Sequence, residues 1–291
     1  MVPSDGEIMA RAGGENFPVA PLVLPRWARA HLMAVYGFAR LADDIGDEVQ
    51  GDRLALLAWL DEEIDRAWTG TPEHPVMRRL AVTVRQLRLS PEPFRQLVEA
   101  NRRDQLVDRY ETIDALMEYC ALSANPVGRL VLEVLGAATP ERLRWSDSVC
   151  TGLQVAEHLQ DVSEDLERGR VYLPQEDLFW FGCSEEDFRS PPFGPEARAL
   201  LGFEVQRART LLDDGSPLVG SLGGRLRLGV AAFVAGGQAA LDGVEQGLRS
   251  PSRVPGRPRR RSAARRLVRV LASSGRRTGQ PSAVRVGAGR P

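Results

Sequence analysis

Apolar residues recur at helical spacing through most of the chain, over residues 25–248. The stretch 54–68 is the clearest example, because its apolar and charged positions fall on opposite sides of a 3.6-residue helix. Its apolar face consists of Leu56, Leu57, Leu60 and Ile64. The alternating pattern typical of strands is nearly absent. The sequence therefore predicts an all-α domain.

Prolines and glycines separate the expected helices. The apolar run 114–135 is interrupted at Asn125-Pro126, and the periodic stretch 145–166 ends at Arg168-Gly169, a common helix ending. Another periodic stretch leads into an acidic cluster, and its common face holds Met33, Tyr36, Gly37, Arg40, Leu41 and Asp44. We expect one helical domain in which two acidic helices face a central apolar cavity.

Two acidic clusters carry the strongest chemical signal. Asp43 and Asp47 are four residues apart, as are Asp161 and Asp165. On a helix this spacing places both carboxylates of a pair on one face, about 6 Å apart along the axis. Such pairs repel unless a cation is bound, and carboxylate oxygens suit Mg²⁺, which usually enters with substrate phosphates. A solvated acidic face is the simpler interpretation of one cluster, whereas two similar clusters favour a metal site.

Composition restricts the class of protein without identifying it. A length of 291 residues with 43% hydrophobic content allows one large domain or two small ones. Cys120, Cys150 and Cys183 lack metal-type spacing and fit buried, reduced thiols. No signal segment or apolar run of membrane-spanning length is evident. We expect a soluble, cytoplasmic chain.

Charge is distributed unevenly along the chain. Residues 251–291 contain 12 arginines and no acidic residue, so residues 1–250 hold 26 arginines against 39 acids. An acidic body argues against nucleic acid as a partner. We divide the chain into an N-terminal extension (1–14), a helical domain (15–248) and an Arg/Pro/Gly-rich tail (249–291). Three interpretations of the tail stay open: a disordered solvated tail, a basic arm for anionic lipid, and an out-of-family reading frame.

Two segments, residues 36–47 and 154–174, resemble the signature regions of squalene/phytoene synthases. These enzymes are head-to-head prenyltransferases with an all-helical isoprenoid-synthase fold, and the resemblance covers about residues 15–245. Three further stretches look like the branch that makes hydroxysqualene from presqualene diphosphate in bacterial hopanoid and squalene synthesis. These stretches are 15–19, 123–129 and 159–162.

The resemblance implies specific roles at the matching positions. The implied Mg²⁺ ligands are Asp43, Asp47, Glu157, Asp161 and Asp165. The residues implied to contact diphosphate or to line the site are Tyr36, Arg40, Tyr119, Asn125, Gln154, Arg170 and Tyr172. Glu157 departs from the family, which usually has asparagine there. Glutamate keeps an oxygen ligand but adds a charge and a longer reach, so the geometry of the second metal site stays open.

Some neighbouring side chains have simpler interpretations. Tyr119 fits a core aromatic as well as a site residue. His158 is expected to face outward, because adjacent helical residues point about 100° apart. Asp44 and Glu164 are expected to lie behind the metal ligands.

The implied function is Mg²⁺-dependent hydroxysqualene synthesis. Presqualene diphosphate would ionise, and water would capture the rearranged cyclopropylcarbinyl cation. Capture by water needs no NADPH, and no glycine-rich dinucleotide-binding unit is evident. The alternatives are condensation of two prenyl diphosphates to presqualene diphosphate or phytoene, and a non-catalytic scaffold. We expect a monomer or homodimer with peripheral contact to the inner face of the membrane.

Overall fold

The computed structural model describes residues 2–10, 24–249, 266–267 and 270–271, and this part of the chain is helical. It contains no strand in these residues, only an isolated bridge between Arg109 and Val171. The prediction of an all-α fold is confirmed. The helices in chain order are α1 (Asp5–Ala10), α2 (Arg26–Asp47), α3 (Arg53–Thr69), α4 (Pro75–Leu87), α5 (Glu92–Arg103), α6 (Ile113–Ser123), α7 (Asn125–Val134), α8 (Pro140–Gln160), α9 (Val162–Glu167), α10 (Gln175–Phe181), the 3₁₀ helix η2 (Glu185–Phe188), α11 (Pro195–Gly215), α12 (Pro217–Ser221) and α13 (Gly224–Arg249).

Local sequence signals explain many of the helix boundaries. The side chains of Asp52, Thr112 and Thr139 cap α3, α6 and α8 by accepting a hydrogen bond from the backbone N–H three residues later. Proline occupies the first turn of α4, α7 and α8, where its missing N–H costs no helical hydrogen bond. Gly182 ends α10 with φ of 66°, a conformation that glycine adopts without strain.

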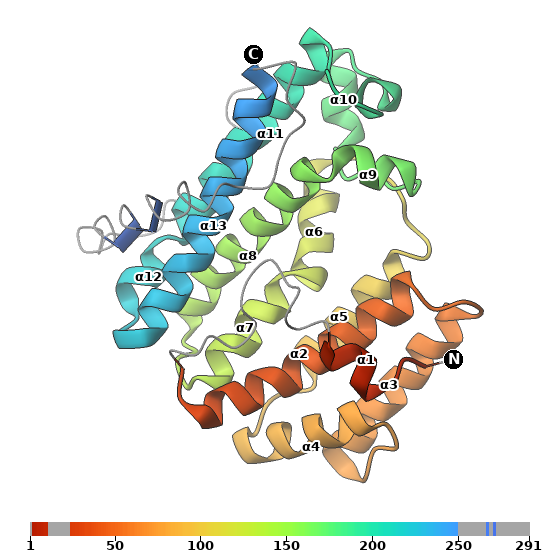
Figure 1. Ribbon diagram of the computed structural model, residues 1–291, viewed down its shortest axis with the longest axis vertical. Helices are drawn as coiled ribbons and strands as arrows, with labels where there is room; N and C mark the ends of the chain where they lie inside the picture. The colour runs from red at the N-terminus through yellow and green to blue at the C-terminus, as the bar shows by residue number, and fades with distance from the viewer. Residues whose placement is uncertain (1, 11–23, 250–265, 268–269, 272–291) are drawn as a thin grey trace.

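The helices form two halves that α6 and α7 join (Figure 1). In the N-terminal half, α2, α3, α4 and α5 pack together around an apolar cluster that includes Phe38 and Phe94. In the C-terminal half, α11 and α13 pack on α8, around a second apolar cluster that includes Leu200 and Leu212. Helices α6 and α7 contact both α5 and α8, so they hold the two halves at a fixed distance.

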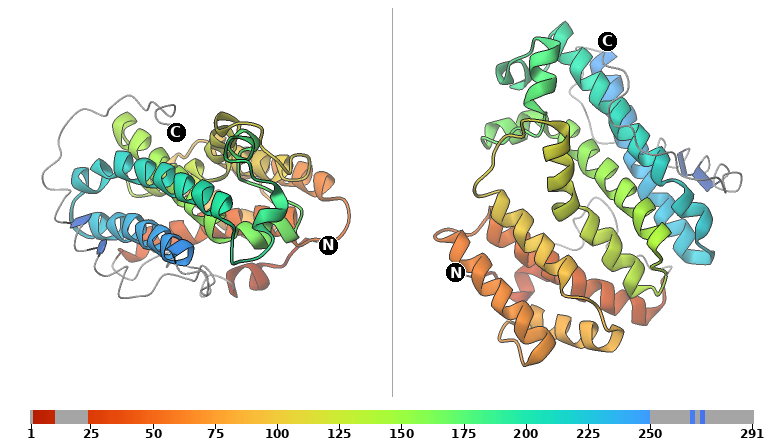
Figure 2. Two further views of the ribbon diagram at one scale, coloured as in Figure 1. Left: turned by 90° about the horizontal axis from the view of Figure 1, so that it is seen from above. Right: turned by 180° about the vertical axis from the view of Figure 1, so that it is seen from behind.

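The two halves are also joined next to the expected site. The chain after α5 runs alongside the chain after α9, and both lie on one side of the molecule (Figure 2). The Val171 N–H donates to the Asp108 carbonyl at 2.8 Å, and the Gln175 N–H donates to the Tyr110 carbonyl at 2.9 Å. These backbone hydrogen bonds fix the position of Arg170 and Tyr172, the two site residues expected after the second acidic cluster.

The helix expected over 145–166 is wrong in one respect: it is two helices. α8 ends at Gln160 and α9 begins at Val162, with Asp161 between them at φ −102° and ψ 12°. The Asp165 N–H still donates to the Asp161 carbonyl at 2.8 Å, so the chain bends without losing this turn. Asp161 and Asp165 therefore do not share the face of one continuous helix.

Only part of the predicted tail lies in the described residues. Arg266 donates to Asp242 of α13 at 2.8 Å, and Val270 is buried. These residues are packed against the helical domain. The remainder of the tail, and the stretch 15–19 that resembled the hydroxysqualene branch, lie outside the described residues. Within the described part, no helix combines the length and apolar character needed to cross a bilayer.

Candidate active site

The first acidic cluster lies at the C-terminal end of α2, and its three aspartates are not equivalent. Asp43 and Asp47 are exposed to solvent, whereas Asp44 is buried. The buried carboxylate pairs with Arg40 at 2.7 Å, and the same guanidinium reaches Glu48 at 2.9 Å. Asp44 therefore lies behind the two exposed carboxylates and neutralises part of the charge of Arg40.

Helix α5 supports this cluster from behind, a role that the sequence did not reveal. Asn101 donates from Nδ2 to Asp43 Oδ1 at 3.3 Å, and Gln105 donates to the Gly46 carbonyl at 3.0 Å. The pKa of Asp43 is raised to about 7, mainly by burial and then by the nearby charges of Asp47 and Asp44. The side chain is nevertheless accessible to solvent. One sequence signal existed: Asn101 lies four residues after Leu97, on the apolar face of α5.

The close approach of α2 and α5 gives a stability prediction at Gly46. A Cβ on Gly46 would lie far inside van der Waals contact of Asn101 Oδ1, and Asn101 is held by its bonds to Asp43 and Leu97. We expect Gly46→Ala to lower the free energy of unfolding by about 1–3 kcal/mol, measured by urea denaturation. Gly202→Ala is the matched control: a Cβ at that helical glycine would meet no atom within 4 Å, so the variant should gain up to about 1 kcal/mol. Equal effects of both substitutions would contradict the packing argument.

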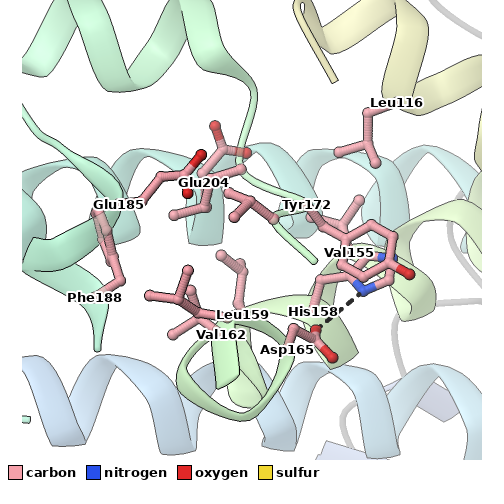
Figure 3. Close-up of a pocket in the computed structure, with 13 residues that line it drawn as sticks. Leu116, Val155, His158, Leu159, Val162, Asp165, Tyr172, Glu185, Phe188 and Glu204 are labelled. Atoms are coloured by element: carbon pink, nitrogen blue, oxygen red, sulfur yellow. Dashed lines mark ion pairs between the residues drawn. The ribbon is translucent and has the colours of Figure 1, made fainter. Parts of the chain in front are cut away.

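The second acidic cluster spans the bend between α8 and α9. Burial raises the pKa of Asp161, and the charges of Asp165 and Glu164 add to this effect. Asp165 lines a mostly apolar pocket formed by α6, α8, α9, η2, α11 and residues 171–173 (Figure 3). Glu157 lies one turn before the bend and is exposed. This cluster is thus also a site of unfavourable negative charge.

His158 faces into the site, and the expectation that it faces outward is wrong. Its imidazole stacks on the Tyr172 ring at 3.7 Å between centroids and 11° between planes. Its Nδ1 lies 3.8 Å from Asp165 Oδ2 (Figure 3). Its Nε2 lies 3.2 Å from Gln154 Nε2. The bend at Asp161 brings the chain after α9 back over α8, so Tyr172 covers a side chain that would face solvent on an isolated helix.

Three tyrosines pack together between the two halves. The rings of Tyr110, Tyr119 and Tyr172 have centroids 5.3–5.9 Å apart. Tyr119 donates from its hydroxyl to Asp104 Oδ2 at 2.8 Å, so it belongs to this polar centre as well as to the core. Burial raises the pKa of Asp104 to about 6, against the lowering effect of the Tyr119 hydrogen bond. Asp104 was missed in the sequence, because it stands alone at the end of α5.

Arg170 links the segment after the second acidic cluster to the first cluster. Its Nη2 lies 2.9 Å from Asp47 Oδ1, across 123 positions in the sequence. Tyr36 is half-buried on α2, one turn before Arg40. Asn125, in contrast, is buried and its Oδ1 accepts a hydrogen bond from the Thr151 hydroxyl at 3.0 Å, which joins α7 to α8.

Comparison with known proteins places this geometry in a family. The sequence profile described as "Squalene/phytoene synthase" matches residues 10–265. The chain belongs to the squalene/phytoene synthase family.

Similar proteins in the family include hydroxysqualene synthases and phytoene synthases. The hydroxysqualene synthase of Zymomonas mobilis is 35% identical over 226 residues, covering 76% of this chain and 74% of that protein. The 15-cis-phytoene synthase of Synechococcus elongatus is 30% identical over 247 residues, covering 80% of each. The crystal structure of squalene synthase HpnC from Alicyclobacillus acidocaldarius is 42% identical with a TM-score of 0.79, and covers 84% of this chain and 92% of that one. A ligand-bound dehydrosqualene synthase, 23% identical with a TM-score of 0.82 over 92% of this chain and 95% of that one, shows the shared fold.

The donor set of this family member fits a hard divalent cation. Among the described residues, no three His, Cys, Asp or Glu side chains already form a metal site. The exposed Asp47 carboxylate nevertheless pairs with Arg170 of the other half. The pKa of Asp43 is raised first by burial and then by the charges of Asp47 and Asp44, and a bound cation would stabilise the charged form of this carboxylate. Carboxylate oxygens are the ligands that Mg²⁺ prefers, and it is commonly bound by one or two carboxylates together with substrate phosphates.

Proposed function

We propose that this member of the squalene/phytoene synthase family converts presqualene diphosphate and water to hydroxysqualene and diphosphate. The observation that carries the proposal is the Arg170–Asp47 ion pair, which joins the first acidic cluster to the segment that follows the second one, from opposite halves of the fold. The similarity to hydroxysqualene synthases supports this choice of reaction. One from Rhodopseudomonas palustris is 36% identical over 214 residues, covering 72% of this chain and 71% of that protein.

The charged residues would serve the departing diphosphate. Asp43, Asp47, Asp161 and Asp165, with Glu157 beside them, would hold Mg²⁺, which when bound neutralises a leaving diphosphate. The guanidinium of Arg170 can exchange the Asp47 carboxylate for phosphate oxygens, since it binds both in the same planar geometry. Arg40 lies one turn before Asp43 on the same face of α2, with its charge partly balanced by Asp44 and Glu48.

The uncharged residues would protect and shape the hydrocarbon. The pocket near Asp165 is lined by apolar side chains that include Val155, Leu159 and Phe188. The faces of aromatic rings attract cations, so Tyr119 and Tyr172 can stabilise a carbocation without reacting with it. Water supplies the nucleophilic oxygen in this reaction, so we propose that no NADPH takes part.

Two other functions are the alternatives to this reaction. Similarity to phytoene synthases favours condensation of two prenyl diphosphates, which would use the same acidic clusters. A non-catalytic scaffold would have no need for two clusters of mutually repelling carboxylates, and their presence argues against it.

One assay separates these functions. Purified protein with Mg²⁺ is incubated with presqualene diphosphate, and separately with farnesyl diphosphate, and both diphosphate release and the extracted products are measured. Hydroxysqualene from presqualene diphosphate is the expected result. If products form from farnesyl diphosphate but not from presqualene diphosphate, the protein has the condensing activity instead. If neither substrate releases diphosphate in a metal-dependent way, the scaffold function is the one supported.

Glu157 offers a milder test of the metal-binding proposal. Glu157→Asn restores the residue usual in the family, and we expect activity within about tenfold of wild type, since tenfold corresponds to about 1.4 kcal/mol. The Mg²⁺ concentration giving half-maximal activity should change, because one charged oxygen ligand becomes neutral. A Mg²⁺ titration of both proteins is the measurement. Superimposable titration curves would mean that Glu157 takes no part in binding the metal.

A further inference from the structure

Two buried polar atoms in the tyrosine cluster lack a hydrogen-bond partner in the described structure. Tyr110 is 5% exposed, yet its hydroxyl neither donates nor accepts a hydrogen bond. Asp104 Oδ1 is likewise buried without a partner, although Asp104 Oδ2 accepts from Tyr119. A buried hydroxyl or carboxylate oxygen left unsatisfied costs about 1–3 kcal/mol or more. Two such atoms in one cluster indicate a shared polar ligand.

The two atoms belong to one compact arrangement. The Tyr110 ring lies 5.3 Å from the Tyr119 ring, and Tyr119 holds Asp104 through its hydroxyl. Tyr110 and Asp104 therefore adjoin the same residue, Tyr119, and the charge of Asp104 is, after burial, the largest influence that raises the pKa of Tyr110. The Tyr119 hydroxyl is engaged, since it donates to Asp104. Of the three tyrosine hydroxyls, that of Tyr110 is the one buried without a partner.

The chemistry of the two atoms defines what they can bind together. The Tyr110 hydroxyl can donate, and the Asp104 oxygen can only accept when ionised. A water molecule satisfies both, by accepting from Tyr110 and donating to Asp104, and buried waters typically make about three such hydrogen bonds. A water bound in this way keeps its second lone pair for an electrophile.

We propose that Tyr110 positions the water that captures the substrate carbocation, with Asp104 as the acceptor of its proton. The inference rests on the proposed function and deepens it by assigning the step that forms the alcohol. After diphosphate has left with the electron pair of its C–O bond, a lone pair of the water forms the new C–O bond to the cationic carbon. The proton released from that oxygen passes to the Asp104 carboxylate and then to solvent, so the step involves no oxidation or reduction.

Removing the Tyr110 hydroxyl tests the assignment by the products formed. With Tyr110→Phe and presqualene diphosphate, we expect diphosphate release within about threefold of wild type. The alcohol fraction should fall at least about tenfold, replaced by hydrocarbons that arise when the cation loses a proton. Thr83→Val is the matched control, because it removes a buried hydroxyl that bonds His31 at 2.9 Å, and it should leave the product ratio unchanged.

The product ratio of Tyr110→Phe can support or overturn the positioning role of Tyr110. An unchanged alcohol fraction in Tyr110→Phe overturns the positioning role, as does loss of diphosphate release with an unchanged thermal melt. Should Tyr110→Phe fail to fold, Asp104→Asn provides the second test. The alcohol fraction of the products of Asp104→Asn is expected to fall too, independently of the total rate of diphosphate release. An unchanged alcohol fraction in this variant would show that the inference is wrong. If the wild type forms no alcohol from presqualene diphosphate, the proposed function fails, and this inference fails with it.

Discussion

Asp43→Asn and Asp161→Asn are expected to fold normally and to release diphosphate at least about 10²–10³ times more slowly than wild type. Loss of a single group that stabilises developing charge commonly has an effect of this size. Each substitution removes one charged oxygen from a cluster proposed to hold Mg²⁺ against the leaving diphosphate. The measurement is metal-dependent diphosphate release from presqualene diphosphate. Near-wild-type rates in both variants would refute the metal-site assignment.

Asp65→Asn is the matched control for these substitutions. Asp65 is a mostly exposed aspartate on α3 whose ion pair with Arg95 lies outside the acidic clusters. We expect this variant to retain wild-type turnover. A comparable loss in Asp65→Asn would show that the substitution acts through general destabilisation.

The same Asp43 variant should be more stable than wild type in the absence of metal. The pKa of Asp43 is about 7 in the folded protein, against an ordinary value of 3.8, so folding disfavours its charged form. Wild type therefore loses stability as pH rises from about 4 to about 7, whereas asparagine does not titrate. Thermal melts in a chelator should show Asp43→Asn melting higher at pH 7.5, with the advantage vanishing near pH 4. A constant difference across this range would contradict the assigned cause.

Arg207→Met is expected to lower the free energy of unfolding by about 3–5 kcal/mol, because it leaves a buried carboxylate without its partner. Arg207 of α11 lies 2.9 Å from Asp177 of α10, and it also pairs with Glu204. All three side chains are at most 9% exposed. Burial, together with the charge of Asp177, raises the pKa of Glu204 to about 8, whereas the nearby Arg207 lowers it. Urea unfolding at pH 7 is the measurement.

Glu204→Gln separates this effect from simple loss of packing. Glutamine resembles the protonated glutamate, so we expect a change within about 1 kcal/mol at pH 7. Because the folded pKa of Glu204 lies above its usual 4.5, wild type should lose stability as pH rises from about 4.5 to about 8, and Glu204→Gln should lack this dependence. A cost below about 1 kcal/mol for Arg207→Met, with the fold retained, would refute the buried-charge argument.

The helical class, many of the helix limits and the two acidic clusters could be predicted from the sequence. These features depend on residues close together in the chain. The helical period of the stretch 54–68 gives α3, where Leu57, Leu60 and Ile64 are fully buried. Prolines and capping side chains act within one turn, so helix starts such as those of α4 and α8 could be predicted. The family also followed from the sequence, because its signature motifs are short and contiguous.

The tertiary structure alone decided how those elements meet. The bend at Asp161 turns His158 inward, because Tyr172 from the following segment packs against it. Asn101 and Asp104 of the α5 region enter the site only because α5 packs against α2 and α6. The Arg170–Asp47 pair likewise joins residues 123 positions apart. Such contacts depend on the packing energy between segments far apart in the sequence, which cannot be predicted from a local pattern. Helical periodicity and capping, in contrast, depend on residues within a few positions of each other.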